Sequence, residues 1–202
     1  MFNYLQMFGS FRPMEQMINS IPKVEYSSVS PHLPQTHVGG SAVVSDCGKY
    51  RYELSRIWDE SKPIVMFLML NPSTADANKD DATIRRCIGF AKSWDFGGLY
   101  VCNIFAFRAT NPKDLLKIDN PFGDKNIWHT RQICDKVESV ICAWGNELIL
   151  RKLLKNDSPC KMFDYAMSKL YYLELSKSGV PKHPLYLKSQ LKPVKYELAV
   201  CL

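Results

Sequence analysis

The sequence lacks the features that most quickly assign a chain to a class. No stretch approaches the roughly 20 consecutive apolar residues of a membrane-spanning helix. The first residues, MFNYLQMFGSFRPMEQM, lack the basic start and long apolar block of a signal peptide. Neither a Walker loop nor a GxGxxG motif is present, so binding of a nucleoside triphosphate or dinucleotide has no direct support. These absences predict a cytoplasmic protein with no membrane partner.

Cysteine occurs, but in no pattern that would hold a metal. The seven cysteines are odd in number and scattered, and no CxxC pair occurs. Zinc and iron–sulfur sites need ligands at closer spacing. We therefore predict buried, reduced thiols, no metal site and no cofactor.

A strong excess of one charge is also missing. The 202 residues carry 26 basic and 20 acidic side chains, a net charge of +6, which is compatible with nucleic-acid binding but does not require it. The surplus is greatest from Lys177 onward, where several lysines surround the dipeptide His183-Pro184. This stretch is either a solvated basic tail or a loop that faces phosphate.

The chain divides into two parts. Residues 1–38 are predicted to be an N-terminal extension and linker, because SSVSPHLPQTHVGG is rich in Ser, Pro and Gly. Residues 39–202 are predicted to form a single α/β domain, since they contain the periodic patterns and are numerous enough for a substantial core.

Strand and helix patterns alternate through the second part. AVVSDCGKYRYELSRIW predicts a β-hairpin. Four apolar runs predict buried strands, in PIVMFLML, GGLYVCNIFAF, ESVICAWG and KLYYLEL. Helical spacing separates them, in DDATIRRCIGFAKSWDF (with Asp80, Asp81 or Thr83 as its cap), NIWHTRQICDKV and NELILRKLLK, with a short helix beginning in NPKDLLKI. This order predicts a three-layer αβα sandwich with a mainly parallel central sheet.

Polar residues stand at the carboxyl ends of these strands, where open α/β sheets bind their ligands. Asn71 follows the first buried strand, Asn103 lies within the second, Trp144 ends the third, and His183 follows the fourth. Taken singly, Asn71 is explained as a turn residue before proline, Trp144 as core and His183 as surface. Asn103 is different, because an amide within an apolar strand costs free energy unless its hydrogen bonds are met.

Four sequence blocks resemble, in order, those of the uracil-DNA glycosylase superfamily: FLMLNPS, LYVCNIFAFRATNPKDL, VICAWGNELILRKLL and KHPLYL. More closely, residues 41–196 resemble the bacterial and phage family known as domain of unknown function 1643. The hallmarks of that likeness are LNPSTAD, DDATIRRC, NIFAFRAT and HPLYL. The resemblance implies a uracil-DNA-glycosylase-like fold.

The resemblance also implies roles for individual residues. Asn71 would orient the attacking water, Asn103 would read the edge of a pyrimidine, and His183 would stabilise negative charge on the departing base. An apolar wedge for the base stack would come from Leu185, Tyr186 and Leu187. The implied substrate-binding set is completed by Pro72, Ser73, Arg108 and Trp144.

Three acids near Asn71 depart from the glycosylase pattern. Asp76, Asp80 and Asp81 are explained as helix N-terminal carboxylates. They could alternatively hold a metal, contact a cationic group of a substrate or take part in a different reaction on a base. Asp76 is for this reason a third candidate catalytic residue, beside Asn71 and His183.

Three functions therefore stay open, all with DNA or a nucleotide as the partner. The first is a glycosylase-like enzyme that hydrolyses the N-glycosidic bond of a pyrimidine or modified pyrimidine. The second is a non-catalytic DNA- or nucleotide-binding module of the same fold. The third is a base-modifying enzyme of phage DNA hypermodification, with the acids in a chemical role. The sequence does not predict the oligomeric state.

Overall fold

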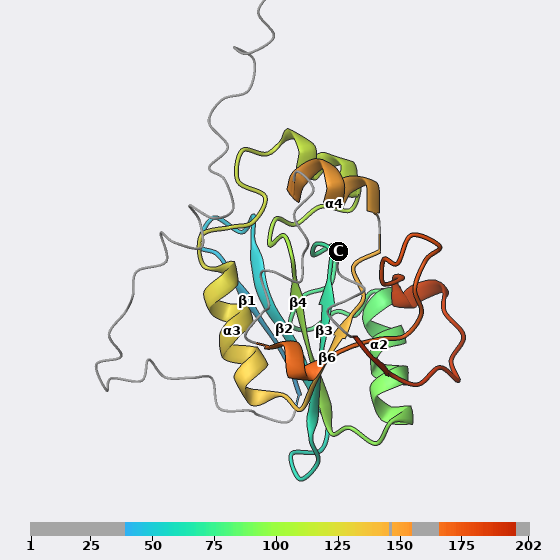
Figure 1. Cartoon of the computed structure of the whole chain (residues 1–202). Coiled ribbons are helices and arrows are strands. Elements are labelled where there is room, and N and C mark those ends of the chain that lie inside the picture. Colours follow the sequence, from blue (N-terminus) through green and yellow to red (C-terminus); the bar gives the residue numbers. More distant parts are fainter. Residues whose placement is uncertain (1–38, 146, 155–165, 197–202) are drawn as a thin grey trace, which may run out of the picture. The chain divides into compact units, whose positions relative to one another are not determined.

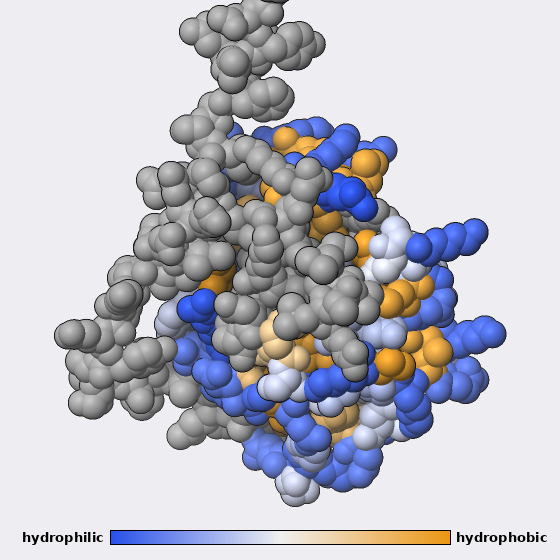
Figure 2. Space-filling view, viewed as in Figure 1, coloured by the Kyte–Doolittle hydropathy of each residue, from blue (hydrophilic) through white to orange (hydrophobic). Residues whose placement is uncertain are grey.

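The computed structural model describes residues 39–145, 147–154 and 166–196, which belong to the compact unit Thr36–Leu202 (Figure 1). The predicted N-terminal extension, residues 1–38, lies outside this described part. None of the helices in these ranges is sufficiently long and apolar to cross a membrane. On the face shown in Figure 2, apolar side chains form patches among hydrophilic ones.

The described residues form an α/β fold around one seven-stranded mixed sheet. The strands are β1 (Gly39–Val44), β2 (Arg51–Ile57), β3 (Ile64–Met69), β4 (Gly98–Asn103), β5 (Ser139–Cys142), β6 (Leu170–Tyr172) and β7 (Val194–Lys195). The helices are α2 (Ala82–Ser93), α3 (Asn126–Lys136) and α4 (Glu147–Leu154), with 3-10 helices η1 (Pro112–Lys117) and η3 (Pro184–Tyr186).

The sheet is mixed, so the prediction of a mainly parallel sheet is corrected. Its order is β1-β2-β4-β3-β5-β6-β7, and only β4, β3, β5 and β6 run parallel to one another. The predicted hairpin β1–β2 exists, but β2 adds to β4 in the antiparallel direction, and β7 adds to β6 in the same way. Apolar periodicity reports burial and not strand direction, which is why the sequence did not reveal these antiparallel edges.

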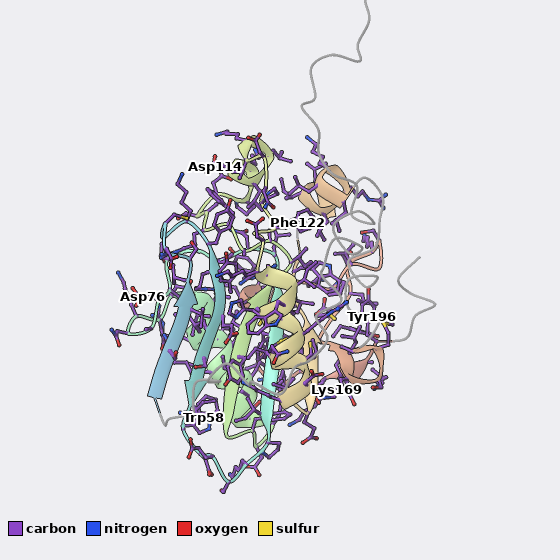
Figure 3. All side chains as sticks on the ribbon, turned by 90° about the vertical axis from the view of Figure 1, so that its left-hand side faces the viewer. Trp58, Asp76, Asp114, Phe122, Lys169 and Tyr196 are labelled. Carbon is purple, nitrogen blue, oxygen red and sulfur yellow. The ribbon has the colours of Figure 1, made fainter. Side chains whose placement is uncertain are left out.

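Strand β3 lies at the centre and is buried on both faces. Its alternate residues Val65, Phe67 and Met69 belong to a core cluster that includes Ile84 and Phe90 of α2. Helix α3 packs against β2, β4 and β3. Figures 1 and 3 show α2 and α3 on opposite sides of the strands. A strand covered on both faces reads as a continuous apolar run, as PIVMFLML does.

Helix α2 begins where the sequence predicts. The carboxylate of Asp81 accepts a hydrogen bond of 2.8 Å from the backbone N–H of Ile84, the arrangement of an N-cap. The predicted short helix of NPKDLLKI is η1, which has proline in its first turn and Asn111 as its cap. These caps fix where the loops after β3 and β4 end.

The cysteines within the described part are free. Cys87, Cys102, Cys134 and Cys142 are buried, as predicted, and Cys47 is exposed. Burial raises the pKa of the Cys87, Cys102 and Cys142 thiols. They therefore stay protonated near neutral pH and behave as small core residues.

Candidate active site

The loops after β3 and β4 are joined at the carboxyl edge of the parallel strands. The side-chain N–H₂ of Asn71 donates to the backbone oxygen of Ala109 at 2.7 Å and to that of Pro72 at 2.9 Å. The backbone N–H of Ala109 donates in turn to the oxygen of Pro72 at 2.9 Å. The Asn71 amide nitrogen is thus used in holding two loops together, and its Oδ1 is the atom left to orient a ligand or water.

Asn103, the last residue of β4, is buried without hydrogen-bond partners for its side chain. Only 1% of the residue is exposed, and neither Oδ1 nor Nδ2 is bonded within the described structure. Leu99 and Val101 belong to the core cluster beside α2, so strand alternation turns Asn103 to the same side. A buried unpaired amide costs about 1–3 kcal/mol. The amide of Asn103 therefore either lowers the stability of the protein without compensation or forms its hydrogen bonds with a ligand.

Two other loops meet at Gly145 and His183. The N–H of Gly145, just after β5, donates to the backbone oxygen of Pro181 at 2.9 Å. Gly145 has a φ of +56°, and a Cβ placed there would lie 3.2 Å from the Cβ of His183 and 3.4 Å from its backbone nitrogen. Glycine is required at this turn both for its left-handed backbone and for the close approach of the His183 segment.

Replacing Gly145 by alanine should destabilise the fold by about 1–2 kcal/mol, since the left-handed backbone is strained for a residue with Cβ and the new methyl meets His183. The measurement is urea unfolding of the variant. Gly89, on α2, is the matched control, because a Cβ there meets nothing within 4 Å. Gly89→Ala should stabilise the protein by up to about 1 kcal/mol through helix propensity. Equal effects of the two changes would contradict this account of the turn.

His183 is held as a neutral imidazole in a defined tautomer. Its Nδ1 accepts a hydrogen bond of 3.3 Å from the backbone N–H of Leu185, at the start of η3. The proton of the neutral ring must then be on Nε2. Burial lowers the pKa of His183 below its usual value, and the carboxylate of Asp81 opposes this shift. Near neutral pH the ring therefore offers one donor, the Nε2–H.

The lowered pKa of His183 predicts a pH dependence of stability. In the window between the pKa in the folded protein and the ordinary value of 6.5, the unfolded chain binds more protons than the folded one. This contribution is fully present above pH 6.5 and is lost as the pH falls through the window. Denaturant unfolding between pH 8 and pH 5 measures it. His183→Gln should lose less stability than the wild type on acidification; identical losses would contradict the assignment.

The segment after His183 exposes one large ring. Tyr186 is 86% exposed, whereas Leu187 is 7% exposed and belongs to the core cluster. Leu185 is half-buried. Of the three residues implied as a wedge, Tyr186 is thus the one that projects from the surface, and the structure assigns Leu187 to packing.

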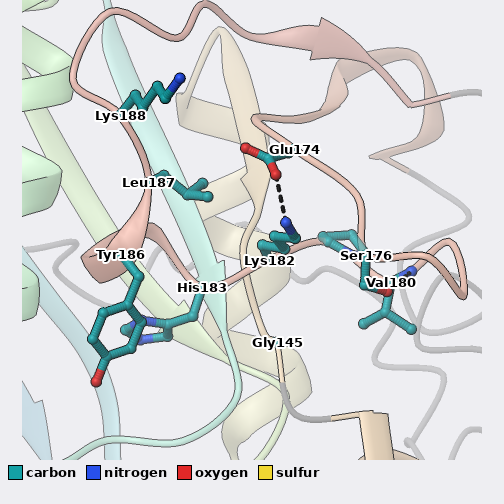
Figure 4. A pocket seen from close by; sticks show the side chains of 10 residues that line it. Gly145, Glu174, Ser176, Val180, Lys182, His183, Tyr186, Leu187 and Lys188 are labelled. Carbon is teal, nitrogen blue, oxygen red and sulfur yellow. Dashed lines mark hydrogen bonds and ion pairs between the residues drawn. The ribbon is translucent and has the colours of Figure 1, made fainter.

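A pocket of about 510 Å³ adjoins this segment. Gly145, His183, Tyr186 and Lys188 contribute to its wall. An ion pair between Lys182 and Glu174 also lines it. In Figure 4 the rings of His183 and Tyr186 lie together on one side, and the ion pair lies on the other. The pocket thus combines an aromatic face with lysine side chains.

The remaining residues of the predicted substrate-binding set are buried or half-buried. Trp144 is only 3% exposed and packs against Tyr196, with ring centroids 6.3 Å apart, which is its ordinary role as core. Pro72 is buried beside Asn71, and Ser73 is half-buried. Arg108 is half-buried, with Nη1 3.5 Å from the backbone oxygen of Gly48.

The three acids shape the loop before α2. The carboxylate of Asp76 accepts two backbone N–H bonds of 2.9 Å from within its own loop and projects from the outside of the molecule (Figure 3). Asp80 forms an ion pair of 2.8 Å with Arg56, and Asp81 caps α2. Within the described ranges, no group of three or more metal-ligating side chains occurs. The helix-terminus interpretation accounts for Asp81, the bonds within its own loop account for Asp76, and the ion pair with Arg56 accounts for Asp80.

One charged residue at this edge is not marked by any sequence pattern. Arg51 is only 2% exposed, and its Nη1 donates to the backbone oxygen of Ala75 at 2.8 Å. It stands in the polar-looking stretch KYRYE, and nothing in that stretch signals a buried cation.

Comparison with known families gives one match. Residues 51–185, about two thirds of the chain, match the family described as "Protein of unknown function (DUF1643)". No curated protein and no solved structure matches the chain.

Proposed function

The chain belongs to the DUF1643 family, and we propose that it recognises a nucleobase and hydrolyses the N-glycosidic bond of a pyrimidine or modified pyrimidine in DNA. The proposal includes the three-layer αβα arrangement of the uracil-DNA glycosylase superfamily as the form of the fold. The observation that carries it is the buried, unpaired amide of Asn103 at the carboxyl edge of the parallel strands. An amide offers one donor and one acceptor side by side, which complements the edge of a pyrimidine.

Stabilisation of the departing base would be the task of His183. In N-glycosidic cleavage the base leaves with negative charge, so a preorganised donor at its oxygen lowers the barrier. The Nε2–H of the neutral imidazole is such a donor. The hydrogen bond from Leu185 to Nδ1 fixes the ring, and burial keeps it neutral.

Water activation would be weak in this site. The Oδ1 of Asn71 can orient a water molecule, but an amide is a poor general base. The described carboxylates nearest in sequence are engaged: Asp76 with its own loop and Asp80 with Arg56. Cleavage would therefore depend more on stabilisation of the departing base than on proton abstraction from water.

Access to Asn103 would require a covering segment to move. Ala75 and Leu187 belong to the same buried cluster as Met69, the register partner of Asn103. The loops that carry them thus pack on the same core as this part of the sheet edge. A base flipped from DNA would displace one of them, while the exposed ring of Tyr186 stacks in the gap left in the duplex.

A second candidate is a module that binds a base without cutting. The hydrogen bonds of Asn71 to two backbone oxygens favour it, because they explain this residue as a structural one. The observations on the acids, in contrast, give no support to the base-modifying alternative.

The test is incubation of the purified chain with oligonucleotides that contain uracil, mismatched or modified pyrimidines, followed by alkali. Alkali-labile sites formed by the wild type, and not by an identically purified Asn103→Leu protein, are the expected result. Salt-dependent binding without alkali-labile sites would replace the enzyme by the binding module. If the chain neither binds nor cleaves these oligonucleotides, both the enzyme and the binding module are overturned.

A further inference from the structure

A β-bulge in β2 turns Arg51 towards the candidate site. In the pairing of β1 with β2, Val43 is opposite Glu53, but the next residue, Val44, is opposite Arg51. Val43 and Val44 are adjacent in β1 and therefore point to opposite faces of the sheet. Each partner in β2 points to the same face as the residue opposite it. Glu53 and Arg51 therefore point to opposite faces, although they are two positions apart. Glu53 bonds to His129 of α3. Arg51 consequently points to the face that carries α2.

On that face, Arg51 is a buried cation without a carboxylate in contact. Its Nη1 bonds to the oxygen of Ala75, its Nε has no partner, and it forms no ion pair with another described residue. Burial lowers the pKa of Arg51 to about 10, so the guanidinium is still charged at neutral pH. Asp81 favours the charge from a distance and Arg108 opposes it. A buried charge without a paired partner is costly.

Arg51 and Asn103 stand on adjacent strands and face the same side of the sheet. Strand β2 pairs directly with β4, and both side chains face the α2 side. In the order of the sheet, His183 follows β6, so Arg51 and His183 lie on opposite flanks of Asn103. In the order of the sheet the three polar groups are thus a guanidinium on β2, an amide on β4 and, beyond β3 and β5, an imidazole after β6.

We propose that Arg51 is a specificity-determining residue of this site, and that the base bound there carries an anionic substituent at the ring position opposite the carbonyl held by His183. This inference rests on the proposed function. If His183 contacts the C2 oxygen of a pyrimidine and Asn103 its N3 edge, the far side of the ring is C5. An anionic oxygen on a C5 substituent would then meet the guanidinium.

The chemistry of arginine selects such a group. A guanidinium has five N–H donors and no acceptor, in a planar fork that matches a carboxylate or phosphate. A ligand that supplies two anionic oxygens would satisfy the unpaired Nε and compensate the buried charge. A methyl group at C5 would leave the Nε of Arg51 without a partner and the buried charge uncompensated.

The experiment compares the binding of 5-carboxyuracil and thymine to the full chain by calorimetry. We expect 5-carboxyuracil to bind at least about ten-fold more tightly, as a bidentate charged pair does relative to a neutral contact. Arg51→Gln should reduce this ratio to near one without weakening thymine binding. Arg85→Gln is the matched control, because Arg85 is an exposed arginine whose guanidinium donates to the backbone oxygen of Asp80; it should leave the ratio unchanged.

Arg51→Lys is a second variant, in case Arg51→Gln does not fold. It keeps the positive charge but lacks the planar pair of N–H donors of the guanidinium. It should retain thymine binding and lose most of the preference. Equal binding of the two bases by the wild type, or an unchanged preference in the folded Arg51 variants, would overturn the inference. So would Arg51-dependent binding of deoxyuridine monophosphate but not of 5-carboxyuracil, because the anion would then be the nucleotide phosphate.

The two levels of the proposal fail in different ways. Arg51-dependent binding of 5-carboxyuracil without any base release would retain the recognition residue and remove the hydrolase. Equal release of thymine-type and 5-carboxyuracil bases from DNA would retain the hydrolase and remove the role of Arg51.

Discussion

Replacing Asn103 by leucine should strongly reduce base release and at the same time stabilise the protein. The amide is 1% exposed and both its polar atoms are unpaired, so an apolar side chain of similar size removes a penalty of about 1–3 kcal/mol. The same change removes the donor and acceptor that read the base, which should reduce the rate of release by about 100-fold or more. Loss of activity with a gain in stability is typical of a functional residue.

Asn126 is the matched control for this change. It is also a buried asparagine, 2% exposed, but its side-chain N–H₂ donates to the backbone oxygens of Asn103 at 2.9 Å and of Ile104 at 3.0 Å. Asn126→Leu should destabilise the protein by about 1–3 kcal/mol, because two carbonyls lose their donor. Urea unfolding and release assays on both variants provide the comparison. A destabilised Asn103→Leu protein would show that the amide has partners and is structural.

Replacing His183 by alanine should reduce base release by about 100- to 1,000-fold, the effect of removing one preorganised donor from a developing anion. The variant also loses the bond from Leu185 to Nδ1, and so it should unfold at a slightly lower urea concentration. The reduction should be in the rate of the chemical step measured in single-turnover reactions, with little change in affinity for uncleaved DNA.

His129 is the control histidine. It lies on α3, stacks on Tyr52 and bonds to Glu53, on the face of the sheet opposite to α2. His129→Gln should weaken the fold and leave single-turnover release unchanged. A loss of release in His129→Gln equal to that in His183→Ala would show that the effect of the latter arises from stability alone.

The sequence predicted the local elements better than the way in which they assemble. The run PIVMFLML contains β3, the spacing of Ile84 and Cys87 marks α2, and Asp81 caps it. These features are local, since burial and capping leave periodicities and side-chain types in the chain. The direction in which β2 and β7 join the sheet depends on long-range pairing, which leaves no such trace.

The candidate site follows the same division. Asn103 is recognisable from sequence because a polar residue interrupts an apolar strand. Arg51 is not recognisable, since a single extra residue in β2 decides which face it points to. For Asp76, the sequence predicted a candidate catalytic residue from its position among three acids. In the structure its carboxylate accepts hydrogen bonds from the backbone of its own loop.

The central claim is that Asn103 and His183 bind one and the same base. The most direct measurement is nitrogen NMR of the labelled chain, following the side-chain amide of Asn103 and the Nε2 of His183 during titration with a pyrimidine base. The claim predicts that both signals shift together with a single dissociation constant, and that Asn103→Leu removes the shift of His183. A shift of one signal without the other, or shifts with different constants, would contradict it.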